Sequence, residues 1–129
     1  MRTTKKADYA LHVKGRSGEE KAGKHLKKLG YRIIEKNFRT RFGEIDIIAE
    51  DGEYLVFVEV KTRTSSRFAN PEDYVDERKQ RKILKSAQIY LLQYSLNERK
   101  CRFDVVSVSD TDKGAKVEVF KDAFCAEEC

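Results

Sequence analysis

Apolar and polar residues follow two different periods along this chain, and the period of each stretch predicts a helix or a strand. The first regular stretch opens with Ser17 and has Glu20 three positions later, which is the pattern of a helix-capping box. The positions that repeat at helical spacing form one inward-facing side: Glu19, Ala22, Leu26 and Leu29. Gly30 is typical of a helix C-terminal cap, so the pattern predicts a helix that begins at Ser17 and ends at Gly30.

β-Branched and aromatic residues then dominate residues 31–38 and 43–63, with Asp51-Gly52 in the middle of the second range. Asp-Gly between two such runs is a strong hairpin signal, so three consecutive antiparallel strands are predicted. The rest of the chain predicts a helix over residues 76–96, a strand over 102–109 and an edge strand over 116–120. This mixture of helices and strands indicates the α/β class.

The predicted hairpin is largely apolar on both sides. If Asp51-Gly52 forms the turn, Glu50 pairs with Glu53, and side-chain alternation then assigns the residues to two faces. One face holds Ile45, Ile47, Tyr54, Val56, Val58 and Val60. The other face holds Glu44, Asp46, Ile48, Leu55, Phe57, Glu59 and Lys61. Strands of this kind lie in the middle of a sheet and are covered on both faces.

Charged residues gather at one end of the second face: Asp46, Glu59 and Lys61. In this register Asp46 is diagonal to Glu59, with Cβ atoms roughly 7–8 Å apart or somewhat less. Two partly desolvated carboxylates repel each other unless a cation lies between them. Hard oxygen donors with room for water favour Mg²⁺ or Mn²⁺ over zinc. Lys61 points to the same side and can reach a phosphate or an attacking water, while Glu19 is a candidate third acid.

A purely structural interpretation of these residues stays open. Acids and a lysine near strand ends often form a solvated rim or ordinary ion pairs, and the helix dipole favours an acid such as Glu19 in a first turn. Glu44 is either a further ligand or a rim residue bonded to Arg41 or Arg63.

Length and charge narrow the classes of protein that fit. The chain has 129 residues, the size of one domain, and its 27 Lys and Arg against 22 Asp and Glu favour a polyanionic partner such as nucleic acid. The three cysteines form no CxxC pair and have no well-spaced histidine, which argues against a zinc site, and a reduced compartment fits them best. No signal peptide or membrane-spanning run is present, so we expect a soluble cytoplasmic protein. The expected organisation is a flexible basic segment over residues 1–16, a folded domain over 17–124 and a tail over 125–129.

Basic residues close to the proposed site in sequence are candidates for binding phosphates. They are Arg39, Arg41, Arg63, Arg67, Arg78, Arg81 and Lys82. Individually, most such residues are ordinary surface charges. Phe42 and Phe68 are candidates for stacking on exposed bases, although a place in the core is the commoner role for phenylalanine.

Asp46 followed by Glu59-Val60-Lys61 resembles the PD-(D/E)XK nuclease superfamily, which includes restriction endonucleases and Holliday junction resolvases. More closely, the segments NFRTRFGEIDIIAEDG, LVFVEVKTR, ANPEDYVDERKQRKILKSAQIYL, CRFDVVSV and KDAF resemble the YraN-like family of uncharacterised bacterial proteins. This resemblance covers residues 15–124 in the same order. It implies a restriction-endonuclease-like fold, with a central mixed sheet, an antiparallel three-stranded meander and flanking helices.

The resemblance also implies roles for individual residues. Asp46 and Glu59 would be metal ligands, Lys61 the catalytic lysine and Glu19 the helix acid, with the carbonyl of Val60 completing the Mg²⁺ or Mn²⁺ site. Lys79 and Gln80 would support the site or bind nucleic acid from the start of the second helix, where an exposed helix end is an equally good interpretation. Ile45 stands where many superfamily members have proline, a small departure from the pattern.

These observations predict a metal-dependent endonuclease that hydrolyses phosphodiester bonds in DNA, with branched DNA as one substrate. The competing interpretation is a non-cleaving nucleic-acid-binding module that keeps the nuclease-like fold as a scaffold. Resolvases act as symmetric dimers, so the resemblance also suggests a homodimer as one arrangement for this chain.

Overall fold

The computed structural model of the protein describes the backbone of residues 6–63 and 75–125, and side chains over residues 17–62 and 75–125. The elements within these ranges are α1 (Lys6–Lys28), β1 (Arg32–Thr40), β2 (Gly43–Asp51), β3 (Tyr54–Arg63), α2 (Glu77–Gln93), β4 (Cys101–Thr111) and β5 (Gly114–Phe124). Neither described helix combines the length and apolar character needed to cross a lipid bilayer.

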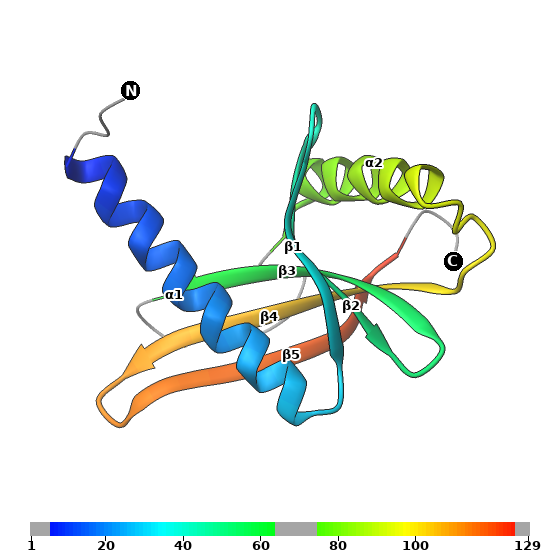
Figure 1. The fold of residues 1–129 in the computed structure, drawn as a ribbon. Helices are drawn as coiled ribbons and strands as arrows, with labels where there is room; N and C mark the ends of the chain where they lie inside the picture. The colour runs from blue at the N-terminus through cyan, green and yellow to red at the C-terminus, as the bar shows by residue number, and fades with distance from the viewer. Residues whose placement is uncertain (1–5, 64–74, 126–129) are drawn as a thin grey trace.

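The strands form one mixed sheet in the order β1-β2-β3-β4-β5. All neighbours are antiparallel except β3 and β4, which run parallel because the chain crosses over through α2 between them. Helix α1 lies across one face of the sheet, and α2 lies beside the long β1–β2 hairpin (Figure 1). The predicted α/β class, the mixed sheet and the antiparallel meander are confirmed, and the arrangement is consistent with a restriction-endonuclease-like fold.

Each helix closes a separate hydrophobic core. Ala22 and Leu26 of α1 pack in a cluster with Ile47, Val56 and Val58 of the sheet. The cluster on the side of α2 contains Ile48, Leu55, Phe57, Ile83, Ala87 and Tyr90. The hairpin is therefore covered on both faces, as its two apolar faces predicted.

Helix α1 begins at Lys6, so the predicted start at Ser17 is wrong. Ser17 lies inside the helix, and its capping-box pattern with Glu20 has no cap to form. The predicted end is correct, since the helix stops at Lys28 and Gly30 has a positive φ of 98°. The Tyr31 N–H donates to the Leu26 carbonyl at 3.0 Å, a helix-ending bond that a glycine at this position makes possible.

The register of the β2–β3 hairpin differs from the predicted one. Asp51 pairs with Tyr54 and Glu50 pairs with Leu55, so the two-residue loop is Gly52-Glu53 rather than Asp51-Gly52. Gly52 has a φ of 61°, which places the residue that tolerates left-handed backbone at the first loop position. The shift is two residues in the pairing, and an even shift leaves the face of each strand residue unchanged.

Strict alternation nevertheless fails at Ile45. Ile45 belongs to the cluster on the side of α2, whereas Ile47 belongs to the cluster on the side of α1, although the prediction placed both on one face. The break lies beside Asn37 of β1, which has a positive φ of 55°. Asp46, the residue between the two isoleucines, lies at this irregularity.

Candidate functional site

Three carboxylates gather where α1 approaches the sheet. Glu19 of α1 and Glu44 and Asp46 of β2 each offer one oxygen, and these oxygens all lie within 4.8 Å of one another. Gly18 brings α1 this close, because a Cβ at that position would lie 2.3 Å from the Thr62 Oγ1 of β3. The acids that gather with Asp46 are therefore Glu19 and Glu44, while a metal site shared by Asp46 and Glu59 stays a prediction.

Asp46 lies at the point where β2 and β3 separate. The last paired residues of the two strands are Ile47 and Val58, and beyond them the Val60 N–H donates to the Asp46 Oδ2 at 2.8 Å. Strand N–H groups point along the sheet toward the neighbouring strand, so this carboxylate takes the place of a strand partner. Burial, followed by the negative charges of Glu59, Glu19 and Glu44, raises the pKa of Asp46 to about 8, although the bond from the Val60 N–H lowers it.

Two neighbouring side chains hold the other acids. The Asn37 Nδ2 donates to the Glu19 Oε1 at 2.9 Å, and the Arg39 Nε donates to the Glu44 Oε2 at 2.9 Å. Burial raises the pKa of Glu19, the bond from Asn37 opposes this rise, and Glu44 adds to it. Among the described side chains, the arginine that pairs with Glu44 is thus Arg39 and not Arg41, while the side chain of Arg63, the other candidate from the sequence, lies outside the described residues.

Glu59 is almost fully buried and is bound to two lysines. The Lys61 Nζ lies 3.7 Å and the Lys79 Nζ lies 3.5 Å from the Glu59 Oε2. Lys79 belongs to α2, so Glu59 is turned toward that helix, yet its charge still raises the pKa of Asp46. Asp46, Glu59 and Lys61 therefore surround one region, with Glu59 next to the carboxylate cluster and outside it.

The other predicted site residues fall into different surroundings. The Gln80 Nε2 donates to the Val75 carbonyl at 2.9 Å and so supports the backbone before α2. Val60 contributes its N–H to Asp46, while a role for its carbonyl stays a prediction. Arg67 and Phe68 lie outside the described residues, and the side chain of Arg63 does too.

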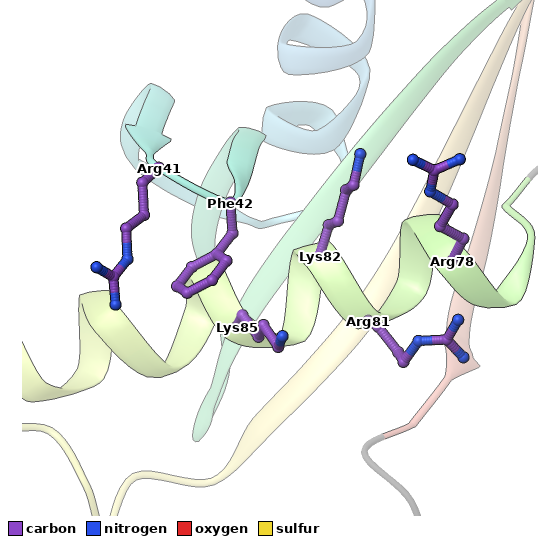
Figure 2. Close-up of a pocket in the computed structure, with 6 residues that line it drawn as sticks. All are labelled: Arg41, Phe42, Arg78, Arg81, Lys82 and Lys85. Atoms are coloured by element: carbon purple, nitrogen blue, oxygen red, sulfur yellow. The ribbon is translucent and has the colours of Figure 1, made fainter.

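Basic residues form a hollow between the β1–β2 turn and α2, here called the cationic hollow. It has a volume of about 350 Å³ and is lined by Arg41, Phe42, Arg78, Arg81, Lys82 and Lys85. Figure 2 shows Phe42 pointing from the turn toward α2, with Lys82 and Lys85 on the facing helix. Phe42 is half-buried and belongs to neither hydrophobic cluster, so the core role considered for it is not the one observed.

Another acid, Asp104 of β4, is fully buried and lies in a bonded network. Its Oδ2 accepts from the Tyr31 Oη at 2.7 Å and from Arg102 at 2.9 Å, and its Oδ1 accepts from the Asp122 N–H at 2.9 Å. Asp46 has no such partner, since it forms no ion pair with any lysine or arginine in the described ranges. Asp104 and Asp46 thus differ in whether the described part of the protein supplies a compensating positive charge.

Sequence reasoning assigned no site role to Asn37 or Lys85 and left the role of Glu44 open. Asn37 gave one signal, because asparagine is unfavourable within a strand and tolerates positive φ. Glu44 was considered as a ligand and set at the rim, although it is two residues from Asp46 on the same strand. Lys85 has the helical spacing that places it next to Arg81 and Lys82 on α2.

Comparison with known proteins identifies close relatives. The family model described as "Uncharacterised protein family UPF0102" matches residues 18–108. A "UPF0102 protein" of Persephonella marina is 50% identical over 96 residues, which cover 74% of this chain and 83% of that protein. One from Syntrophus aciditrophicus is 48% identical over 110 residues, covering 85% of this chain and 87% of the relative. A third, from Chlorobium limicola, is 44% identical over 126 residues, or 93% and 98% of the two chains.

Proposed function

We propose that this chain, which belongs to uncharacterised protein family UPF0102, the family of the YraN-like proteins, is a metal-dependent endonuclease that hydrolyses phosphodiester bonds in DNA. Its membership of the PD-(D/E)XK superfamily is part of the same proposal. A cytoplasmic location, expected from the sequence, is also part of the proposal.

One observation carries the proposal: Asp46 is a partly buried acid that is crowded by other acids and has no lysine or arginine partner in the described ranges. Burying a carboxylate costs free energy unless it is paired or neutralised. The fold meets this requirement at Asp104 with Arg102, but at Asp46 it adds Glu19, Glu44 and the charge of Glu59 instead. Repulsion of this kind is concentrated at functional sites, where a ligand supplies the missing positive charge.

The donor set fits a hard divalent cation. The oxygens of Glu19, Glu44 and Asp46 within 4.8 Å of one another, with Glu59 beside them, are the ligand type that Mg²⁺ and Mn²⁺ prefer. Asp46 and Glu59 would hold the ion together with the carbonyl of Val60, and Glu19 would reach it directly or through water. A bound Mg²⁺ lowers the pKa of water and offsets negative charge on a phosphate.

The chain's own residues would orient the reactants. Lys61 lies 3.7 Å from Glu59 with 27% of its side chain exposed, so its ammonium is held near the acids and remains accessible. We assign it to orienting the attacking water or to balancing charge on the phosphate. Lys79, whose ammonium lies 3.5 Å from the same oxygen of Glu59, would hold that carboxylate in place from α2.

Cleavage of labelled branched, flapped and linear DNA in the presence of Mg²⁺ tests the function. We expect cleavage by the native protein, none by Asp46→Asn, and a loss of about 10²-fold or more in turnover for Lys61→Ala, whose DNA affinity should change little. Asp110→Asn, at an exposed aspartate of β4, is the matched control and should cleave normally. Equal cleavage by the Asp46 and Lys61 variants would reveal a contaminant or a different site.

A non-cleaving binding module is the alternative, because the cationic hollow could hold nucleic acid without any metal. The two functions differ in their response to cations. Calorimetric titration with Mg²⁺ or Mn²⁺ should show binding that disappears in Asp46→Asn if the protein is a nuclease. Binding of DNA without any Asp46-dependent cation binding would favour the module.

A further inference from the structure

We propose that the cationic hollow binds an unpaired nucleotide of the DNA substrate, with the base stacked on Phe42 and the neighbouring phosphates on the surrounding cations. This inference deepens the proposed function and rests on it, because it names DNA with a single-stranded segment as the substrate class.

The aromatic ring of Phe42 lies outside both hydrophobic clusters. It lies in the β1–β2 turn, and Arg41 and Lys85 place their cationic groups 4.9 Å and 5.0 Å from the ring centroid. Both side chains are exposed and long, so either group can move to a phosphate while a base takes its place on the ring. Stacking on aromatic rings is the usual way in which proteins hold unpaired bases.

The turn that carries Phe42 is fixed to α2 before any ligand arrives. The Phe42 N–H donates to the Thr40 Oγ1 at 3.0 Å, and this hydroxyl lies 2.8 Å from the Oγ of Ser86, a fully buried residue of α2. The Thr40 hydroxyl also donates to the Gly43 carbonyl at 3.2 Å. A hollow with pre-positioned walls loses less conformational entropy on binding than a mobile one.

The charge of the hollow is not balanced by the rest of the described protein. Its cations, all exposed, form no ion pair with a carboxylate of residues 17–62 or 75–125: Arg41, Arg78, Arg81, Lys82 and Lys85. Elsewhere, Arg39 pairs with Glu44 and Arg99 pairs with Glu50. Five clustered positive charges around one aromatic ring suit a polyanion with an accessible base, and paired bases in a duplex offer no free face to that ring.

The hollow is also close to the acids along the chain. Asp46 lies four residues after Phe42, at the start of β2. At about 3.3 Å per residue of extended strand, this corresponds to roughly 13 Å along the chain. A nucleotide held at Phe42 would therefore place a nearby phosphodiester within reach of the carboxylates. Substrates with a flap, bulge or branch supply such an unpaired nucleotide next to duplex DNA.

Binding of a fluorescently labelled single-stranded oligonucleotide and of its duplex, measured by anisotropy in EDTA, tests this inference. We expect Phe42→Leu to weaken single-strand binding by about 5- to 150-fold, the contribution of stacking one base, and to leave duplex binding nearly unchanged. Phe42→Tyr, which keeps the ring, should bind like the native protein. An equal loss for both DNA forms, or no loss, would overturn the stacking role.

The cations are tested separately by the salt dependence of single-strand binding. The double variant Lys82→Ala/Lys85→Ala should reduce the slope of log K against log salt by about 0.7 for each phosphate that these lysines neutralise in the native protein. Lys113→Ala, at the exposed β4–β5 turn, is the matched control and should keep the native slope. An unchanged slope in the double variant would remove these lysines from the proposal.

These measurements need neither a metal ion nor cleavage. Phe42-dependent single-strand binding by a protein that does not cut DNA would retain the hollow and reject the nuclease. Cleavage that depends on Asp46, together with unchanged single-strand binding by Phe42→Leu, would retain the nuclease and reject the role of the hollow.

Discussion

Asp46 shows how a single residue can point to function through its surroundings. Its pKa is raised to about 8, since burial and the charge of Glu59 both oppose ionisation. In the unfolded chain the same carboxyl has a pKa of about 3.9. Between these two values the folded protein retains a proton that the unfolded chain releases, so this group makes the free energy of unfolding fall as pH rises.

The variant Asp46→Asn tests this pH dependence, because asparagine can still accept the Val60 N–H but does not ionise. In EDTA, its thermal midpoint relative to the native protein should rise progressively as pH increases from about 4 toward about 8. Thermal unfolding at a series of pH values measures the difference. A difference that is constant across this range would mean that Asp46 ionises normally and lies in no crowded site.

Sequence reasoning was least complete for the roles of individual residues. Asp104 and Asp46 are both acids in apolar strands, and nothing local distinguishes the one that pairs with Arg102 from the one beside Glu19 and Glu44. The distinction depends on which side chains meet across strands. The positive φ of Asn37, which accompanies the break in alternation, is equally a product of the assembled sheet.

The packing of one secondary-structure element against another positions Glu19, because α1 closely contacts β3. Gly18 faces Thr62 so closely that an added Cβ would lie 2.3 Å from its hydroxyl oxygen. Glycine within a helix normally lowers stability by about 0.5–1 kcal/mol relative to alanine. The close contact with Thr62, which leaves no room for a Cβ, explains why a glycine is found at this helix position. Glu19, the next residue, reaches the carboxylate cluster as a consequence.

Gly18→Ala should therefore lower stability instead of raising it, by about 1–3 kcal/mol, and should weaken binding of Mg²⁺ by displacing Glu19. Denaturant unfolding and calorimetry measure the two effects. Thr62→Ala removes the clashing oxygen, so the double variant Gly18→Ala/Thr62→Ala should recover most of both losses. A single variant as stable as the native protein, with normal cation binding, would show that this contact does not position Glu19.

Element boundaries were predictable where local chemistry decides them. Gly30 ends α1 and Asp76 caps α2 by accepting from the Lys79 N–H at 2.8 Å, both at the positions that the sequence indicated. The start of α1 was missed because residues 6–16 carry little apolar periodicity, and the capping-box pattern at Ser17 imitates a start. The hairpin register was missed because Gly52 fits either position of a two-residue loop. The loop can therefore be Asp51-Gly52, as predicted, or Gly52-Glu53, as observed.

For the whole molecule, the hydrophobic pattern was sufficient for the fold class and the two-faced meander. Apolar residues that repeat every two positions in a strand, or at helical spacing in a helix, show which face of the element is buried. The buried faces determine how helices and sheet pack in layers. The cationic hollow was only partly foreseeable, because Arg41 and Phe42 join Arg78, Arg81 and Lys82 only when the β1–β2 turn docks on α2. Which acids converge likewise depends on the packing of α1 against the sheet.

The most direct test of the metal site is the anomalous signal from a crystal soaked in Mn²⁺. We expect a peak at bonding distance from the Asp46 carboxylate and from at least one of Glu19, Glu44 and Glu59, and no such peak in crystals of Asp46→Asn. A peak that persists in the variant, or the absence of any peak at Asp46 in the native protein, would contradict the account.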